Sequence, residues 1–162
     1  MEHLRHQARR DRSLPSEIGA APKSITLSIY ASQPNAVGEA RDALADCLRE
    51  WKLSDDHADD VLLCCSELLS NVARHVSPPT CVLCLEGGAT VRLVVRDSSS
   101  DLPRVRDGRF MAESGRGLIL INALASRWGA DLTLDGKVVW VEFDTSPTEA
   151  TACGEGKVRW SA

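Results

Sequence analysis

Three side chains of different chemistry lie at helical spacing in the middle of the chain. Glu67, Asn71 and Arg74 fall within roughly 60° of one another on a helical wheel. The carboxylate can accept a proton from an attacking hydroxyl, the amide oxygen can bind Mg²⁺, and the guanidinium can bind phosphate oxygens. An ordinary solvated helix face has the same composition, so this set alone leaves both interpretations open.

Two other segments carry residues suited to a nucleotide. Asp97 ends a predicted strand, where its carboxylate can accept a hydrogen bond from an adenine amino group or simply begin a turn. The segment Gly115-Arg116-Gly117-Leu118 begins a predicted helix. Glycines there allow close approach of the backbone, and the free N–H groups of a helix start bind phosphate. The same glycines can also be simple hinges.

Periodicity predicts the elements that must position these residues. Alternating residues predict strands, and apolar residues three and four apart predict helices. The predicted strands are 24–30, 80–86, 90–96, 131–134 and 138–143, and the predicted helices start at Pro34–Asn35, at Ser54 or Asp55, and at Gly117. The second helix extends to His75 and the third to Arg127, before Gly129. The order is β-α-α-β-β-loop-α-β-β.

This order predicts an α/β (α+β) two-layer sandwich. Hairpins at Gly87–Gly88 and Asp135–Gly136 make the mixed sheet mostly antiparallel, and three helices cover one face. Residues 1–22 predict a flexible N-terminal arm and residues 145–162 a flexible C-terminal tail, on either side of one domain at 23–144. The long polar stretch 98–114 predicts a functional loop.

Composition narrows the class of protein. The net charge of −4 and pI near 5.6 argue against direct binding of nucleic acid. No run of 18 apolar residues predicts a membrane span, and the basic start lacks the apolar stretch of a secretory signal, so we expect a cytoplasmic protein. A thiol or zinc protein is the alternative suggested by six cysteines. Cys81 and Cys84 lie on a predicted strand, however, and residues three apart point to opposite faces.

Taken together, the motifs resemble those of a known ATPase family. Residues 67–75 resemble the asparagine box of the gyrase, histidine-kinase and chaperone (GHKL) type of ATPase, and 94–99 with 102–103 resemble its first glycine box. Residues 115–118 and 123–129 resemble the second glycine box, and 136–140 resemble the closing hairpin. The resemblance covers residues 24–143 and is greatest to the single-domain anti-sigma-factor serine-protein kinases.

This resemblance implies a role for each motif. Asn71 would hold Mg²⁺, Glu67 would be the general base, and Arg74 would contact phosphate. Asp97 would recognise adenine. The phosphates would lie along Gly115, Arg116, Gly117 and Leu118, under a mobile ATP lid at 98–114.

The sequence also departs from the family pattern. Ser99 and Asp101 occupy positions where the wider family has glycines, which puts lid flexibility in question. Val138 stands where the family often has a threonine that helps to bind adenine, a loss of about 1 kcal/mol. His75 lies in the second predicted helix, so we expect it to be a packing or capping residue rather than a phosphorylated histidine.

Two functions follow from the resemblance. The first is a protein-serine kinase that uses ATP and Mg²⁺ to phosphorylate an antagonist protein and that binds a sigma factor in transcription regulation. The alternative is a non-catalytic, nucleotide-gated protein-binding module. We expect no membrane partner, and the resemblance allows a homodimer.

Overall fold

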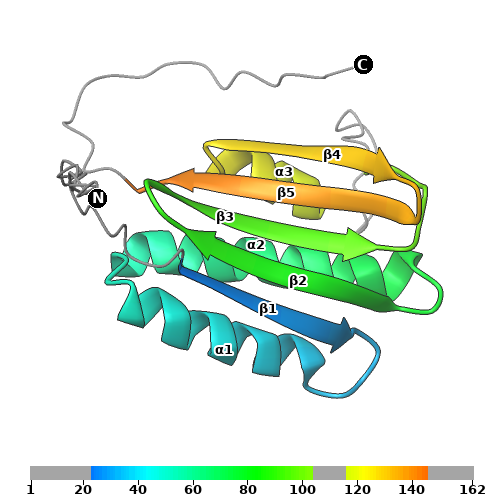
Figure 1. Ribbon diagram of the computed structural model, residues 1–162, viewed down its shortest axis with the longest axis horizontal. Helices are drawn as coiled ribbons and strands as arrows, with labels where there is room; N and C mark the ends of the chain where they lie inside the picture. Colours follow the sequence, from blue (N-terminus) through cyan, green and yellow to red (C-terminus); the bar gives the residue numbers. More distant parts are fainter. Residues whose placement is uncertain (1–22, 104–115, 146–162) are drawn as a thin grey trace, which may run out of the picture.

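The computed structural model describes residues 23–103 and 116–145. These residues form five strands and three helices in the predicted order (Figure 1). The strands are β1 (Lys23–Tyr30), β2 (Thr80–Gly87), β3 (Thr90–Asp97), β4 (Arg127–Thr133) and β5 (Gly136–Asp144). The helices are α1 (Ala36–Glu50), α2 (Asp55–His75) and α3 (Arg116–Leu124). The predicted arm at 1–22 and nearly all of the predicted tail lie outside the described residues, as does most of the predicted lid.

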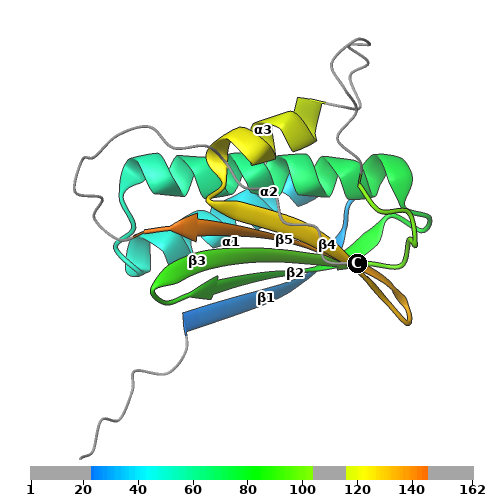
Figure 2. The same ribbon diagram turned by 90° about the horizontal axis from the view of Figure 1, so that it is seen from above.

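The five strands form one sheet in the order β1-β2-β3-β5-β4. Every neighbouring pair is antiparallel, and the three helices lie on one face of the sheet (Figure 2). The predicted two-layer α+β sandwich is therefore confirmed. The strand order places β3 at the centre of the sheet, with β2 on one side and β5 on the other, so Asp97 at the end of β3 lies between two hydrogen-bonded neighbours.

Amphipathic periodicity accounts for the two long helices. Ser54 caps α2, because its hydroxyl accepts a hydrogen bond from the N–H of His57, and Ser77-Pro78 follows the helix end. Six residues of α2 are buried against the sheet and the other helices: Val61, Cys64, Cys65, Leu68, Leu69 and Val72. This buried stripe fixes the rotation of α2 about its own axis. The rotation in turn fixes the direction in which the side chains of Glu67 and Asn71 point.

Two predicted boundaries are wrong. The third helix ends at Leu124 rather than Arg127, and β4 begins at Arg127 rather than Asp131. The N–H of Ser126 donates to the carbonyl of Glu142, which starts pairing with β5 before the predicted helix would end. The half-buried Trp128 packs against the core and donates to Asn122. Pairing with β5 and burial of Trp128 therefore override the local helical pattern.

Strand geometry separates Cys81 from Cys84 as predicted. Cys81 is buried on the helix side of β2, whereas Cys84 is half-buried on the opposite face. The pair cannot share a metal ion. None of the helices in the described ranges is long and apolar enough to cross a membrane.

Candidate functional site

The face of α2 that carries the candidate residues is divided between packing and solvent. Glu67 and Asn71 are half-buried, whereas Arg74 is exposed. The Nε–H of Arg74 donates to the carbonyl of Ser70 at 3.1 Å, so its guanidinium lies along its own helix. Glu67 and Asn71 are therefore partly shielded from solvent, whereas Arg74 lies on the surface.

Glu67 meets the start of α3. Gly117 is buried in the first turn of α3, and a Cβ atom added there would lie 2.5 Å from Oε2 of Glu67. A larger residue at this position would displace the end of the Glu67 side chain. Leu118 is 6% exposed and belongs to the hydrophobic core, where it anchors the same turn. The tertiary structure therefore brings the predicted base to the predicted phosphate-binding turn.

The rest of that turn is only partly described. Arg116 is the first residue of α3. Gly115 lies outside the described residues.

Asp97 is buried at the end of β3, on the helix side of the sheet. Its Oδ1 atom accepts two hydrogen bonds of 2.8 Å, one from the N–H of Ser99 and one from Nζ of Lys137. The side chains of Asp97 and Lys137 are only 3% and 9% exposed. Burial strengthens a charged hydrogen bond, so this pair is held firmly.

The β4–β5 turn holds the pair in place. Gly136 has a φ of 149°, in the region that favours glycine. A Cβ atom at Gly136 would overlap the backbone carbonyl of Asp97 and lie 2.6 Å from Cα of Ser98. The turn therefore packs directly on the residue that begins the loop, and Lys137 follows immediately.

Lys137 was missed by the sequence interpretation, which assigned the altered adenine contact to Val138. The register pairs Lys137 with Asp97 and Val138 with Arg96, an exposed residue. Val138 thus lies on the sheet face away from the helices, because side chains alternate along a strand. The signal was present in the sequence: Lys137 shares the parity of the core residues Val139 and Val141.

Ser99 and Asp101, which stand where the resemblance expects glycines, take part in local hydrogen bonds after Asp97. The N–H of Ser99 binds Asp97, and the N–H of Asp101 donates to the hydroxyl of Ser99 at 3.2 Å. Both are side-chain caps of the kind that stabilise turns. The first residues of the predicted lid are therefore held by local hydrogen bonds.

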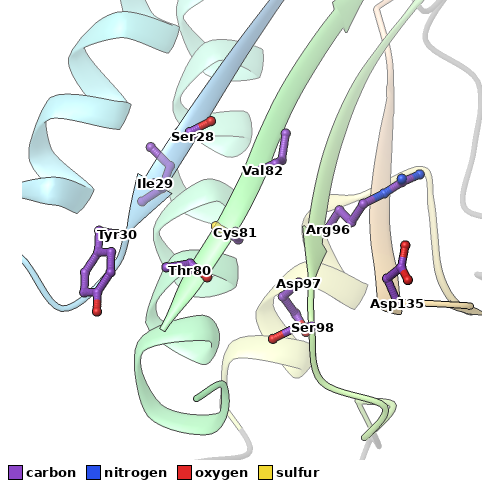
Figure 3. Close-up of a pocket in the computed structure, with 10 residues that line it drawn as sticks. All are labelled: Ser28, Ile29, Tyr30, Thr80, Cys81, Val82, Arg96, Asp97, Ser98 and Asp135. Atoms are coloured by element: carbon purple, nitrogen blue, oxygen red, sulfur yellow. The ribbon is translucent and has the colours of Figure 1, made fainter. Parts of the chain in front are cut away.

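A cleft of about 420 Å³ lies at the ends of β1, β2 and β3 (Figure 3). Tyr30, Thr80 and Arg96 line it, and Asp97 and Ser98 form part of its wall. Glu67, Asn71 and Gly117 do not line it. This cleft therefore adjoins only the Asp97 end of the predicted site.

Burial favours the protonated form of two cysteines near the site. Burial raises the pKa of Cys81 to about 11, and the charge of Asp97 adds to the effect. Burial raises the pKa of Cys64 to about 12, with smaller contributions that include Glu67. Both thiols stay protonated near neutral pH, whereas the reactive form of cysteine is the thiolate.

Comparison with known proteins identifies the family. The model of the histidine kinase-like ATPase domain matches residues 30–143. The structure is also similar to the RsbU and RsbW domains of Rv1364c from Mycobacterium tuberculosis, with a TM-score of 0.56 and 18% identity. That similarity covers 74% of this chain and 31% of the other, and at this identity it shows the fold alone. No curated protein matches the chain. The chain therefore belongs to the histidine kinase-like ATPase domain family.

Proposed function

We propose that this protein binds Mg-ATP and transfers the γ-phosphoryl group to a serine hydroxyl of a partner protein. The contact between Glu67 and Gly117 is the observation that supports this function most directly. It places a carboxylate from α2 beside the start of α3, where free N–H groups favour phosphate. A proton acceptor and a phosphate-binding turn are the two protein components that the transfer requires.

In this proposal Glu67 accepts the proton of the serine hydroxyl as the serine oxygen attacks the γ-phosphorus. The bond from that phosphorus to the oxygen of ADP breaks, and the leaving electrons stay with ADP. The turn at Gly115, Arg116, Gly117 and Leu118 holds the phosphates through its backbone N–H groups. Leu118 contributes by anchoring the turn in the core.

The residues on α2 fit a magnesium ion. Asn71 is half-buried and one helical turn from Glu67, so an amide oxygen and a carboxylate share one side of the helix. Mg²⁺ prefers oxygen ligands and retains several waters, which suits a site with few protein ligands. Asn71 would hold the ion, which when bound supplies positive charge to the phosphate oxygens. Arg74 would reach the phosphates only after leaving the carbonyl of Ser70.

Asp97 would accept a hydrogen bond from the amino group of adenine. One of its oxygens already binds Lys137 and Ser99, and no hydrogen bond involves the other oxygen within the described ranges. Burial at the end of a central strand gives the carboxylate a fixed position. The base would therefore lie on the helix side of the sheet, the side that carries Glu67 and Asn71.

By resemblance, the partners would be a sigma factor and an antagonist protein that carries the target serine. Such a regulator of transcription would act in the cytoplasm, and a homodimer is compatible with it. One solved structure with this fold is described as containing an RsbW domain. The alternative is a nucleotide-gated binding module without transfer. The hydrogen bond of Arg74 to Ser70 favours that alternative, because it holds the guanidinium along α2 rather than free to bind phosphate.

The two functions are separated by a pull-down followed by a transfer assay. Partners captured from native cytoplasm with ADP or ATP are incubated with radiolabelled ATP and the purified protein. We expect labelled serine with wild type and none with Glu67→Ala, while Mg-ATP binding by calorimetry is retained in both. Glu50→Gln, an exposed site at the end of α1, is the control and should transfer normally. Equal transfer by Glu67→Ala and wild type would exclude the base role, and binding without transfer by wild type would favour the module.

A further inference from the structure

The buried pair of Asp97 and Lys137 presents a hydrogen-bond acceptor and a donor side by side. Nζ of Lys137 lies 2.8 Å from Oδ1 of Asp97, and the two residues face each other in the β3–β5 register. An ammonium group has three N–H donors, and the bond to Asp97 uses one. Within residues 23–103 and 116–145, no other acceptor binds this ammonium. The pair therefore has donors and an acceptor left over.

These leftover groups match one edge of adenine. Adenine presents an amino group, which donates, next to ring nitrogen N1, which accepts. A carboxylate alone can accept a hydrogen bond from the amino group but cannot donate one to N1. We infer that Lys137 is a specificity-determining residue that donates a hydrogen bond to ring nitrogen N1 while Asp97 accepts from the amino group. This inference rests on the proposed binding of ATP.

The backbone around the pair supports a fixed recognition element. Gly136 lies directly against the carbonyl of Asp97 and Ser98, and the β3–β5 pairing holds Lys137 opposite Asp97. Ser99 holds Oδ1 from the other side. Both side chains have the parity of core residues, so they face the helix layer that carries Glu67 and Asn71. In the inferred complex, the base would therefore lie on the helix side of the sheet, the side that both groups face.

A purely structural ion pair would predict something different. It would hold β3 and β5 together, and its loss would lower stability without changing which base atoms matter. The test must therefore compare nucleotides rather than stability. Two analogues isolate the two contacts: 1-deaza-ATP lacks the ring acceptor, and purine riboside triphosphate lacks the amino group.

The experiment measures the dissociation constants of ATP and both analogues by calorimetry, for wild type, Lys137→Met and the exposed control Lys23→Met. We expect wild type and Lys23→Met to bind 1-deaza-ATP about ten-fold more weakly than ATP, because a hydrogen bond to a charged group is lost. For Lys137→Met, the dissociation constants of ATP and 1-deaza-ATP should agree within about three-fold. This variant should still bind purine riboside triphosphate, which lacks the amino group, more weakly than ATP.

The outcomes separate this inference from the proposed function. Wild type that binds ATP and 1-deaza-ATP equally overturns the role of Lys137 and leaves ATP binding intact. Discrimination retained in Lys137→Met overturns it as well. Absence of ATP binding in wild type overturns both. If Lys137→Met does not fold, because Asp97 loses its partner, the comparison is made between Asp97→Asn and the double variant Asp97→Asn/Lys137→Met. The ratio of the dissociation constant of 1-deaza-ATP to that of ATP should then fall only in the double variant.

Discussion

Replacement of Gly117 by alanine tests the contact on which the proposed chemistry depends. The added Cβ atom would lie 2.5 Å from Oε2 of Glu67. Because non-bonded heavy atoms pack about 3.5 Å apart, the carboxylate must retreat by about 1 Å. A displacement of about 1 Å at a catalytic group lowers the rate by about 100-fold. We therefore expect Gly117→Ala to lower serine phosphorylation by about two orders of magnitude.

The same substitution should leave the fold intact. Gly117 is helical, without a positive φ, and alanine is more favourable than glycine inside a helix by about 0.5–1 kcal/mol. The obstructing atom is the end of a flexible side chain, which can move. The melting temperature of Gly117→Ala should therefore change little, and Mg-ATP should still bind.

The assay compares transfer rates of Gly117→Ala with those of Gly38→Ala. Gly38 lies in the first turn of α1, where an added Cβ meets nothing within 4 Å, so its replacement should be silent. The alanine at 117 should also have little further effect in a Glu67→Gln background, since the base is already absent. A folded Gly117→Ala protein that transfers phosphate at the wild-type rate would refute the role of this contact.

Two further predictions concern ligand binding and pH. Mg-ATP at one hundred times its dissociation constant should add about 2.7 kcal/mol to the free energy of unfolding and raise the melting temperature by about 5–10 °C. An undiminished shift of the melting temperature in Asn71→Ala would contradict the role of Asn71 in holding Mg²⁺. Burial raises the pKa of Cys64 and Cys65 to about 12 and that of Cys81 to about 11, above the ordinary value of 9.0. The unfolded chain then releases these protons first, so the contribution of the thiols to the free energy of unfolding should be constant well below pH 9. Above pH 9 it should fall, by up to about 1.4 kcal/mol per pH unit for each thiol. Urea unfolding at pH 8 and pH 10 measures this, with Cys65→Ala expected to lessen the slope; equal stability at both pH values would contradict it.

Local patterns were enough to predict most of the fold. The apolar stripe of α2 and the alternation in the strands depend on the period of each element, which neighbouring residues in the chain define. The cap at Ser54 and the stop at Ser77-Pro78 act within one helical turn, so the bounds of α2 were predicted closely. The order of these elements then allowed few arrangements other than a sheet with helices on one face.

The end of α3 could not be predicted in this way. Residues 125–127 continue a helical pattern, yet Ser126 bonds to Glu142 and Trp128 packs on the core. The energy of pairing with β5 comes from residues distant in the chain, which a local pattern does not contain.

The site shows the same division between local and distant interactions. Residue type and order identified Glu67, Asn71 and Asp97 as candidates, because their chemistry and spacing are properties of short segments. The contact of Glu67 with Gly117 and the pairing of Asp97 with Lys137 join residues on different elements. Helix packing decides the first contact and strand register the second, and both arise only when the layers come together. Tertiary structure therefore decided which of these side chains meet.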